Sequence, residues 1–166
     1  MIKVLTHEDS NQFKQLISTA HEEKTSPYFD KVYALPTHTL ENSDQLLHPD
    51  SQNQVVILGA FHHDALIGFI QLNFNLEITK RHKALLKSLY VAPPYRHEDI
   101  AQQLVETLIS FARDKGIEHI VLSVASNNIA AKNFFNQLGF EFLAIEAHAR
   151  KIDDRYIEDH WFIYYT

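Results

Sequence analysis

The sequence has 166 residues with no cysteine and only four glycines, and 15 Lys and Arg against 21 Asp and Glu give a net charge of −6. The lack of cysteine excludes a disulfide scaffold, a thiolate nucleophile and a Cys-ligated zinc site. The acidic balance argues against nucleic acid and anionic membranes as partners. The length predicts one domain over 1–166. Because the sequence contains no apolar run of signal-peptide or membrane-span type, we expect a cytoplasmic protein.

The first predicted elements are a strand over Ile2–Leu5 and a helix that follows it. Thr6 and Asp9 have the spacing of a capping box at the start of that helix. Apolar residues at helical spacing then mark its buried face, and they are Phe13, Leu16, Ile17 and Ala20.

A loop from Lys24 to Pro36 interrupts this pattern and contains three aromatic residues. Such a loop is either a lid over a site or a satellite of the core, and both readings stay open. On the first reading, Tyr28 and Tyr33 are candidates for contact with a substrate. A short helix over Leu40–Leu47 is predicted next.

Three strands follow, the first two joined as a hairpin. Their ranges are Val55–Phe61, Leu66–Phe74 and Ala84–Val91. The turn between the first two contains His62, His63 and Asp64, which we interpret as turn residues rather than metal ligands, so no metal site is expected.

The second half alternates helices with strands. The predicted helices are one over Ile100–Ala112, closed at Gly116, and one that begins at Asn127 or Asn128 and ends before Gly139. The predicted strands are His119–Val124, Phe140–Ile145 and Tyr156–Tyr165, with a solvated turn over Arg150–Arg155. The fold class is therefore α/β (α+β): a mixed, mostly antiparallel sheet of six to seven strands with helices on both faces.

The passage from the third strand into the long helix is the stretch most typical of a binding site. A helix start presents free backbone N–H groups and the positive end of the helix dipole, which favour a phosphate. Arg96 lies just before this helix and could add a bidentate donor to the phosphate.

In this stretch the chain resembles the GNAT superfamily of N-acetyltransferases. The family has a Val-x-Pro-x-Tyr-Arg-like segment, then an Arg/Gln-x-x-Gly-x-Gly/Ala loop, then an Asn-x-x-Ala-x-x-x-Tyr-x-x-Leu-Gly-Phe helix. The positions that match here are Val91, Pro93 or Pro94, Tyr95, Arg96, Ala101, Asn128, Ala131, Leu138, Gly139 and Phe140. The order of predicted elements also fits the GNAT fold over nearly the whole chain.

The resemblance implies acetyl-CoA as co-substrate and an amine of a small molecule or peptide as acceptor. It implies that the backbone of Leu89, Tyr90 and Val91 pairs with the pantetheine amides, where this strand separates from the strand that begins at His119. It further implies that the pyrophosphate faces the backbone N–H groups of His97, Glu98, Asp99, Ile100 and Ala101. Asn128 would contact the pantetheine arm or the acetyl-transfer region, and Ala131 and Phe135 share its helix.

Two positions depart from the family pattern. Asp99 stands where the family has its first loop glycine, so its carboxylate either lies near the pyrophosphate or caps the helix and points away. Phe135 stands where the family usually has the tyrosine that protonates the leaving thiolate, and phenylalanine cannot donate a proton. Lys87 and Ser88 occupy the stretch where many members carry a carboxylate base, so no general base is predicted.

Two functions follow as hypotheses. The first is an N-acetyltransferase that works by direct attack of the amine on the thioester, with Asn128 as the only, weak, candidate for a catalytic group. The alternative is a catalytically impaired protein of the same fold that acts as a CoA-binding or regulatory module. Either could form a homodimer by pairing exposed closing strands, for which Tyr156–Tyr165 is the candidate.

Overall fold

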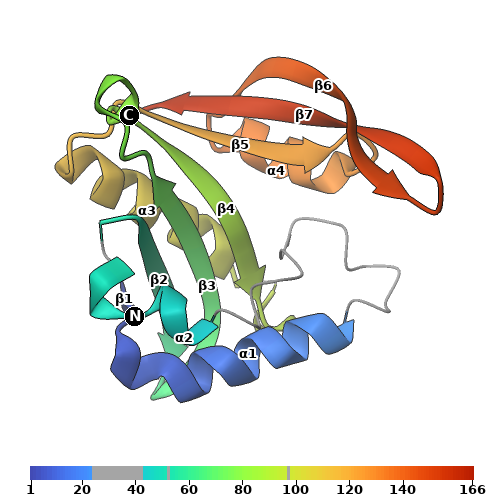
Figure 1. The fold of residues 1–166 in the computed structure, drawn as a ribbon. Coiled ribbons are helices and arrows are strands. Elements are labelled where there is room, and N and C mark those ends of the chain that lie inside the picture. The colour runs from blue at the N-terminus through green and yellow to red at the C-terminus, as the bar shows by residue number, and fades with distance from the viewer. Residues whose placement is uncertain (24–42, 52, 97) are drawn as a thin grey trace.

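The computed structural model describes residues 1–23, 43–51, 53–96 and 98–166. Its seven strands form one sheet in the order β1-β2-β3-β4-β5-β7-β6 (Figure 1). The strands are β1 (Ile2–Val4), β2 (Val55–His62), β3 (Ala65–Phe74), β4 (Lys83–Val91), β5 (His119–Ala125), β6 (Glu141–Ile152) and β7 (Arg155–Tyr165). The mixed, mostly antiparallel sheet predicted from the sequence is confirmed.

The α-helices cover both faces of this sheet. They are α1 (Ser10–Glu23), α2 (Ser43–Leu46), α3 (Ile100–Asp114) and α4 (Ile129–Gln137). Short 3-10 turns are η1 (His7–Asp9), η3 (Pro49–Ser51), η4 (Ile78–Lys80) and η5 (Pro93–Tyr95). Among the residues described, no helix is both long and apolar enough to cross a membrane.

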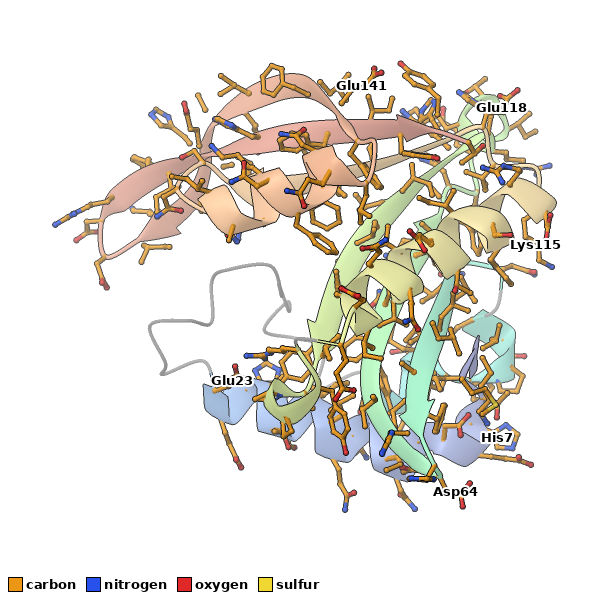
Figure 2. The ribbon with its side chains drawn as sticks, turned by 180° about the vertical axis from the view of Figure 1, so that it is seen from behind. His7, Glu23, Asp64, Lys115, Glu118 and Glu141 are labelled. Atoms are coloured by element: carbon orange, nitrogen blue, oxygen red, sulfur yellow. The ribbon has the colours of Figure 1, made fainter. Side chains whose placement is uncertain are left out.

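The sheet separates two apolar cores. Helices α3 and α4 contribute Leu104, Leu108 and Phe135 to a large core on one face. Helix α1 contributes Phe13 and Ile17 to a smaller core on the other face (Figures 1 and 2). Strands β2, β3 and β4 contribute side chains to both cores, because successive residues of a strand point to opposite faces.

Local sequence signals explain where the helices begin. The capping box is formed: Thr6 N donates to Asp9 Oδ2 over 2.9 Å, and the Thr6 hydroxyl caps the same turn. It caps η1, which leads directly into α1. Asn128 caps α4, since its Oδ1 accepts a hydrogen bond from Ala131 N over 3.1 Å.

Strand β6 differs most from its prediction, because it continues to Ile152 rather than ending at Ile145. Arg150 consequently lies in the strand, and its Nε donates to Asp159 Oδ1 on β7 over 2.6 Å instead of lying in a solvated turn. The predicted short helix over Leu40–Leu47 is observed only as α2, and residues 40–42 lie outside the described residues.

Candidate functional site

The sheet opens between β4 and β5. These are the two parallel neighbours, and they pair over three positions only, the last being Leu85 with Val121. Beyond Leu85, strand β4 stays paired to β3 alone, as in the pairs Leu89 with Ile70 and Val91 with Gly68. The predicted separation of these strands is therefore confirmed, and Leu89, Tyr90 and Val91 lie along it.

An irregularity in β4 lies beside this gap. The register between β3 and β4 shifts so that Gln71 faces Ser88 and Leu72 faces Leu86, which leaves Lys87 without a partner across the strands. Ser88 is only 1% exposed, and its hydroxyl has no hydrogen-bond partner in the structure described. A buried hydroxyl without a partner is costly, so this side chain is a natural contact for a ligand or a water.

The connection from β4 to α3 carries the predicted phosphate-binding residues. Asp99 has φ 60° and ψ 18°, the left-handed conformation that glycine adopts without strain. Its side chain makes no capping hydrogen bond, so of the two alternatives left open for this carboxylate, the helix cap is not formed. Its carbonyl accepts from Gln103 N over 3.0 Å, and the earlier N–H groups of Ile100 and Ala101 have no intrahelical acceptor. His97 lies outside the described residues.

The Arg96 side chain is turned toward Glu23, the last residue of α1. Its two terminal nitrogens lie 2.5 Å from Glu23 Oε2 and 2.9 Å from Glu23 Oε1, and its Nε donates to the Val91 carbonyl over 2.9 Å. The guanidinium carbon lies 5.4 Å from the centre of the Tyr90 ring, and the Tyr90 hydroxyl donates to Glu23 Oε1 over 2.6 Å. We call Glu23, Tyr90 and Arg96 the Glu23 cluster; direct contact of Arg96 with a phosphate stays a prediction.

The cluster shifts two pKa values in opposite directions. Burial acts to raise the pKa of Glu23, but the hydrogen bonds from Arg96 and Tyr90 and the Arg96 charge together hold it below its usual range. Burial and the neighbouring Glu23 carboxylate raise the pKa of Tyr90. Glu23 is therefore an anion at neutral pH, and Tyr90 is a neutral hydroxyl that donates to it.

The predicted residues of α4 lie beside the carboxyl end of β5. Asn128 follows that strand by three residues and caps the helix, while Ala131 and Phe135 are buried at 1% and 3% exposure. The Phe135 ring packs against Phe134 and Phe140, with centroids 5.0 and 5.4 Å away. These ring contacts are apolar, and the Phe135 side chain itself has no proton to donate.

Because β4 and β5 are parallel, their carboxyl ends point toward the same edge of the sheet and lie on either side of the gap. This brings Leu89, Tyr90, Val91, Arg96, Glu98, Asp99, Ile100, Ala101 and Asn128 to the same end of the gap, whereas Tyr28 and Tyr33 lie outside the described residues. Sequence reasoning missed Glu23. The polar run around it, His21-Glu22-Glu23-Lys24, carries no spacing signal that singles it out.

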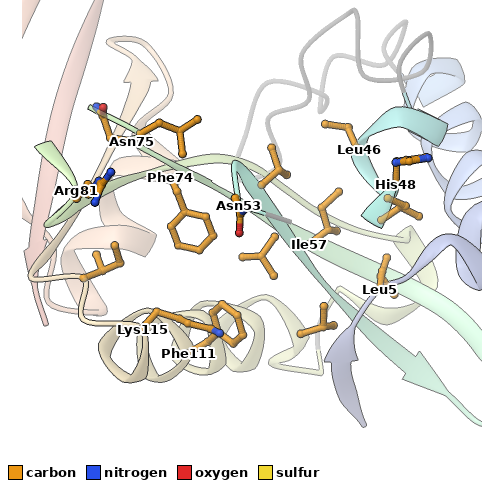
Figure 3. A pocket seen from close by; sticks show the side chains of 16 residues that line it. Leu5, Leu46, His48, Asn53, Ile57, Phe74, Asn75, Arg81, Phe111 and Lys115 are labelled. Carbon is orange, nitrogen blue, oxygen red and sulfur yellow. The ribbon is translucent and has the colours of Figure 1, made fainter. Parts of the chain in front are cut away.

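A separate hollow of about 730 Å³ lies at the opposite end of α3 (Figure 3). Phe74, Phe111 and Lys115 are among its lining residues. None of the site residues predicted from the sequence lines it. The candidate site therefore lies at the gap between β4 and β5 and not in this hollow.

The chain matches a family model described as an acetyltransferase (GNAT) domain over residues 2–161. Of the solved structures similar to it, a probable acetyltransferase from Staphylococcus epidermidis is 30% identical, with a TM-score of 0.82 and coverage of 100% of this chain and 98% of that one. A Salmonella typhimurium protein solved with its cofactor acetyl-CoA has a TM-score of 0.79 at 17% identity, over 99% of this chain and 92% of that one, and shows likeness of fold.

A curated relative, spermidine N(1)-acetyltransferase from Thermoplasma acidophilum, is 31% identical over 98 residues. The match covers 59% of this chain and 58% of that relative. A second, human N-acetyltransferase 8, is 34% identical over 38% of this chain and only 28% of its own length. The chain thus aligns with little more than half of the first relative and about a quarter of the second.

Proposed function

Since the chain belongs to the GNAT acetyltransferase family, we propose that it transfers the acetyl group of acetyl-CoA to a primary amine of a small molecule or peptide. The observation that carries this proposal is the gap between β4 and β5, which opens beside the start of α3. The acetyl-CoA bound to the Salmonella protein of the same fold supports the choice of co-substrate.

The residues at the gap fit the two ends of that co-substrate. Asp99 keeps the left-handed backbone of the glycine that the family has there, so the N–H groups of Ile100 and Ala101 keep the direction that suits a diphosphate. The edge of β4 at Leu89, which no strand pairs on the side of the gap, offers backbone groups to the pantetheine amides, which would continue the sheet. The cofactor-binding roles proposed for Glu98, Ala131 and Phe135 rest on the family motif.

The proposed reaction requires no covalent enzyme intermediate. The amine nitrogen forms a bond to the thioester carbon, the carbon–sulfur bond breaks, and the nitrogen loses a proton while the thiolate gains one. Phe135 cannot supply that proton, and the hydroxyl of Tyr90 is already committed to Glu23. We therefore infer that water protonates the thiolate, and that Asn128 acts on the cofactor arm rather than on the proton.

Binding of CoA measured by isothermal titration calorimetry tests the first step without knowledge of the acceptor. We expect saturable binding at micromolar to millimolar CoA, in competition with acetyl-CoA. Release of free CoA from acetyl-CoA in the presence of a panel of amines, including spermidine and peptides with free α-amines, then identifies the acceptor. No heat of binding up to several millimolar CoA would refute the proposal.

A catalytically impaired protein of the same fold is the second candidate, and Phe135 favours it. The variant Phe135→Tyr separates the two, because it restores the family's proton donor at a position that the fold already buries. New turnover in Phe135→Tyr, with none in the parent chain, would support the impaired protein. Turnover of any amine by the parent chain would exclude it.

A homodimer remains a proposal, but with a different strand. Strand β7 lies between β5 and β6, so the predicted pairing through Tyr156–Tyr165 is wrong. The edge strand is β6, where Phe142, Leu143 and Ile145 are 55%, 48% and 55% exposed. Sedimentation velocity at micromolar concentrations tests whether this edge pairs with a second copy, and a monomer at all concentrations would remove the proposal.

A further inference from the structure

The Glu23 cluster joins two distant parts of the chain at the entrance to the proposed cofactor site. Glu23 ends α1 on one face of the sheet, and Arg96 lies 73 positions later, just before α3 on the other face. Figure 2 shows Glu23 at the end of α1, next to the turn that precedes α3. The contact therefore ties the first helix to the chain segment that leads into the helix start.

The backbone of the turn over 92–96 is held by Ala92 N to the Ile67 carbonyl at 2.7 Å, Tyr95 N to the Ala92 carbonyl at 3.0 Å and Arg96 N to the Pro93 carbonyl at 3.3 Å. The Tyr95 side chain packs, partly buried, against the large core. Among the described residues, Arg96 supplies all the side-chain hydrogen bonds of this turn, two to Glu23 and one to Val91. Asp99, which follows, provides no cap that would fix the start of α3 in another way.

The ion pair between Arg96 and Glu23 is shielded from solvent, so it can hold the two segments in a fixed geometry. The side chains of Arg96 and Glu23 are 18% and 16% exposed, and both oxygens of the carboxylate are used in a bidentate arrangement. The ring of Tyr90, itself fully buried, lies beside the guanidinium and adds a third contact to the carboxylate. These contacts hold the guanidinium in one orientation, in which its Nε donates to the Val91 carbonyl.

We propose that Glu23 is a positioning residue for acetyl-CoA: by holding Arg96, it fixes the turn over 92–96 and thereby the direction of the first N–H groups of α3. This inference rests on the proposed function, since it concerns the diphosphate of the same co-substrate. Glu23 acts on the ligand only through Arg96 and does not touch it. The alternative, that Glu23 keeps Arg96 away from a phosphate for which it would otherwise compete, predicts the opposite sign.

The experiment compares CoA affinity in the full chain and in the variant Glu23→Gln by calorimetry. The variant keeps the shape of the side chain and removes its charge. We expect a CoA dissociation constant about five-fold higher, which corresponds to about 1 kcal/mol. The matched control is Asp44→Asn, which also removes one negative charge from an ion pair made by α1: Asp44 of α2 pairs with Lys14 of α1 at 2.8 Å, and this pair is exposed. Its CoA affinity should remain within a factor of 1.5.

A double-mutant cycle with Arg96→Gln distinguishes positioning from general destabilisation. If Glu23 acts through Arg96, Glu23→Gln has no further effect on CoA affinity in the Arg96→Gln background. An equal loss in both backgrounds would overturn the proposal, and so would an unchanged or tighter CoA affinity in Glu23→Gln alone. Should Glu23→Gln fail to fold, Glu23→Asp replaces it, and an affinity within a factor of 1.5 of the parent would overturn the proposal.

The two proposals fail in different ways in this experiment. A parent chain that binds no CoA contradicts the proposed function. A parent chain that binds CoA as tightly as Glu23→Gln contradicts only the positioning role of Glu23.

Discussion

On the side of α3 and α4, the sheet buries an almost wholly apolar core, in which Leu104 and Leu108 are completely covered. On the side of α1, the same strands bury the polar side chains of Gln71 and Ser88, at 4% and 1% exposure, and the partly buried Glu23 cluster lies at the end of α1. Buried polar groups weaken a core unless they are paired, so a fold built for stability alone would avoid them. The two faces therefore differ in kind: one is a packed apolar support, and the other holds polar groups at the edge of the proposed site.

The apolar face should be the more sensitive to truncation. Leu108→Ala removes a fully buried side chain from α3 and leaves a cavity, so we expect the free energy of unfolding to fall by about 2 to 5 kcal/mol. Urea denaturation followed by circular dichroism measures this loss. Gln102→Ala, on the exposed side of the same helix, is the control and should change stability by less than about 0.5 kcal/mol. Equal losses at the two positions would contradict the role assigned to this face.

The ion pair on the polar face should contribute less, and in a pH-dependent way. Glu23→Gln should lower the free energy of unfolding at pH 7 by about 2 kcal/mol, between the values for exposed and buried ion pairs. Because folding lowers the pKa of Glu23, its contribution is present above the unfolded pKa of about 4.3 and is lost as the pH falls through the folded pKa.

The stability difference between the parent and Glu23→Gln should accordingly shrink when unfolding is measured from pH 6 down to pH 3. A difference that stays constant over this range would show that the carboxylate charge is not what Glu23 contributes. Asp44→Asn, at an exposed pair, provides the reference for loss of one surface charge.

Asp99 lies where the chain enters the α3 face, and its left-handed backbone conformation is a local strain at the proposed site. Asp99→Gly should raise the free energy of unfolding by about 0.5 to 1 kcal/mol, since glycine adopts the left-handed conformation without a clash at Cβ. Thermal unfolding detects the change. Asp99→Ala should instead destabilise the protein. Alanine keeps the clash at Cβ, and it tolerates the left-handed conformation less well than the short polar side chain of aspartate does. We also expect Asp99→Gly to bind CoA several-fold more tightly, as the carboxylate no longer lies near the diphosphate.

Substitution of Ser88 should show the smallest effect on stability. It tests the contrast between the polar face on the side of α1 and the apolar face on the side of α3. Ser88→Ala removes a buried hydroxyl that has no partner among the described residues, so the free energy of unfolding should be unchanged or higher by up to about 1 kcal/mol. If this hydroxyl contacts the acceptor or an ordered water at the site, turnover falls while stability does not. A clear loss of stability would show that the hydroxyl is satisfied in solution by a structural water.

Local signals were sufficient to predict most of the elements and the start of the site. Capping residues such as Thr6 and Asn128 and the apolar spacing of α3 act over a few residues, and the structure confirms them. The mixed sheet followed from the order of elements, whereas the gap between β4 and β5 was expected from the family resemblance. The full extent of β6 could not be predicted, because this strand is exposed on both faces and has no alternating pattern.

The contacts that shape the site were beyond local reasoning. The pairing of Glu23 with Arg96 spans 73 positions and depends on where α1 ends relative to the turn before α3. The left-handed backbone of Asp99 was equally hidden, because the residue type suggested a cap. In both cases the fold determines the role of a residue whose sequence context is ordinary.

The separation of β4 from β5 also affects how quickly backbone amides of β4 exchange hydrogen for deuterium. Ala92 N donates to the Ile67 carbonyl of the neighbouring strand, and in an antiparallel ladder the orientation alternates, so the groups of Leu89 and Val91 face the gap. The amide of Leu89, which no strand accepts on the side of the gap, should exchange faster than the strand-paired amides around it although it lies in the middle of a sheet. A ligand that fills the gap would slow exchange of the Leu89 amide. Hydrogen exchange would therefore detect ligand binding without any chemical turnover.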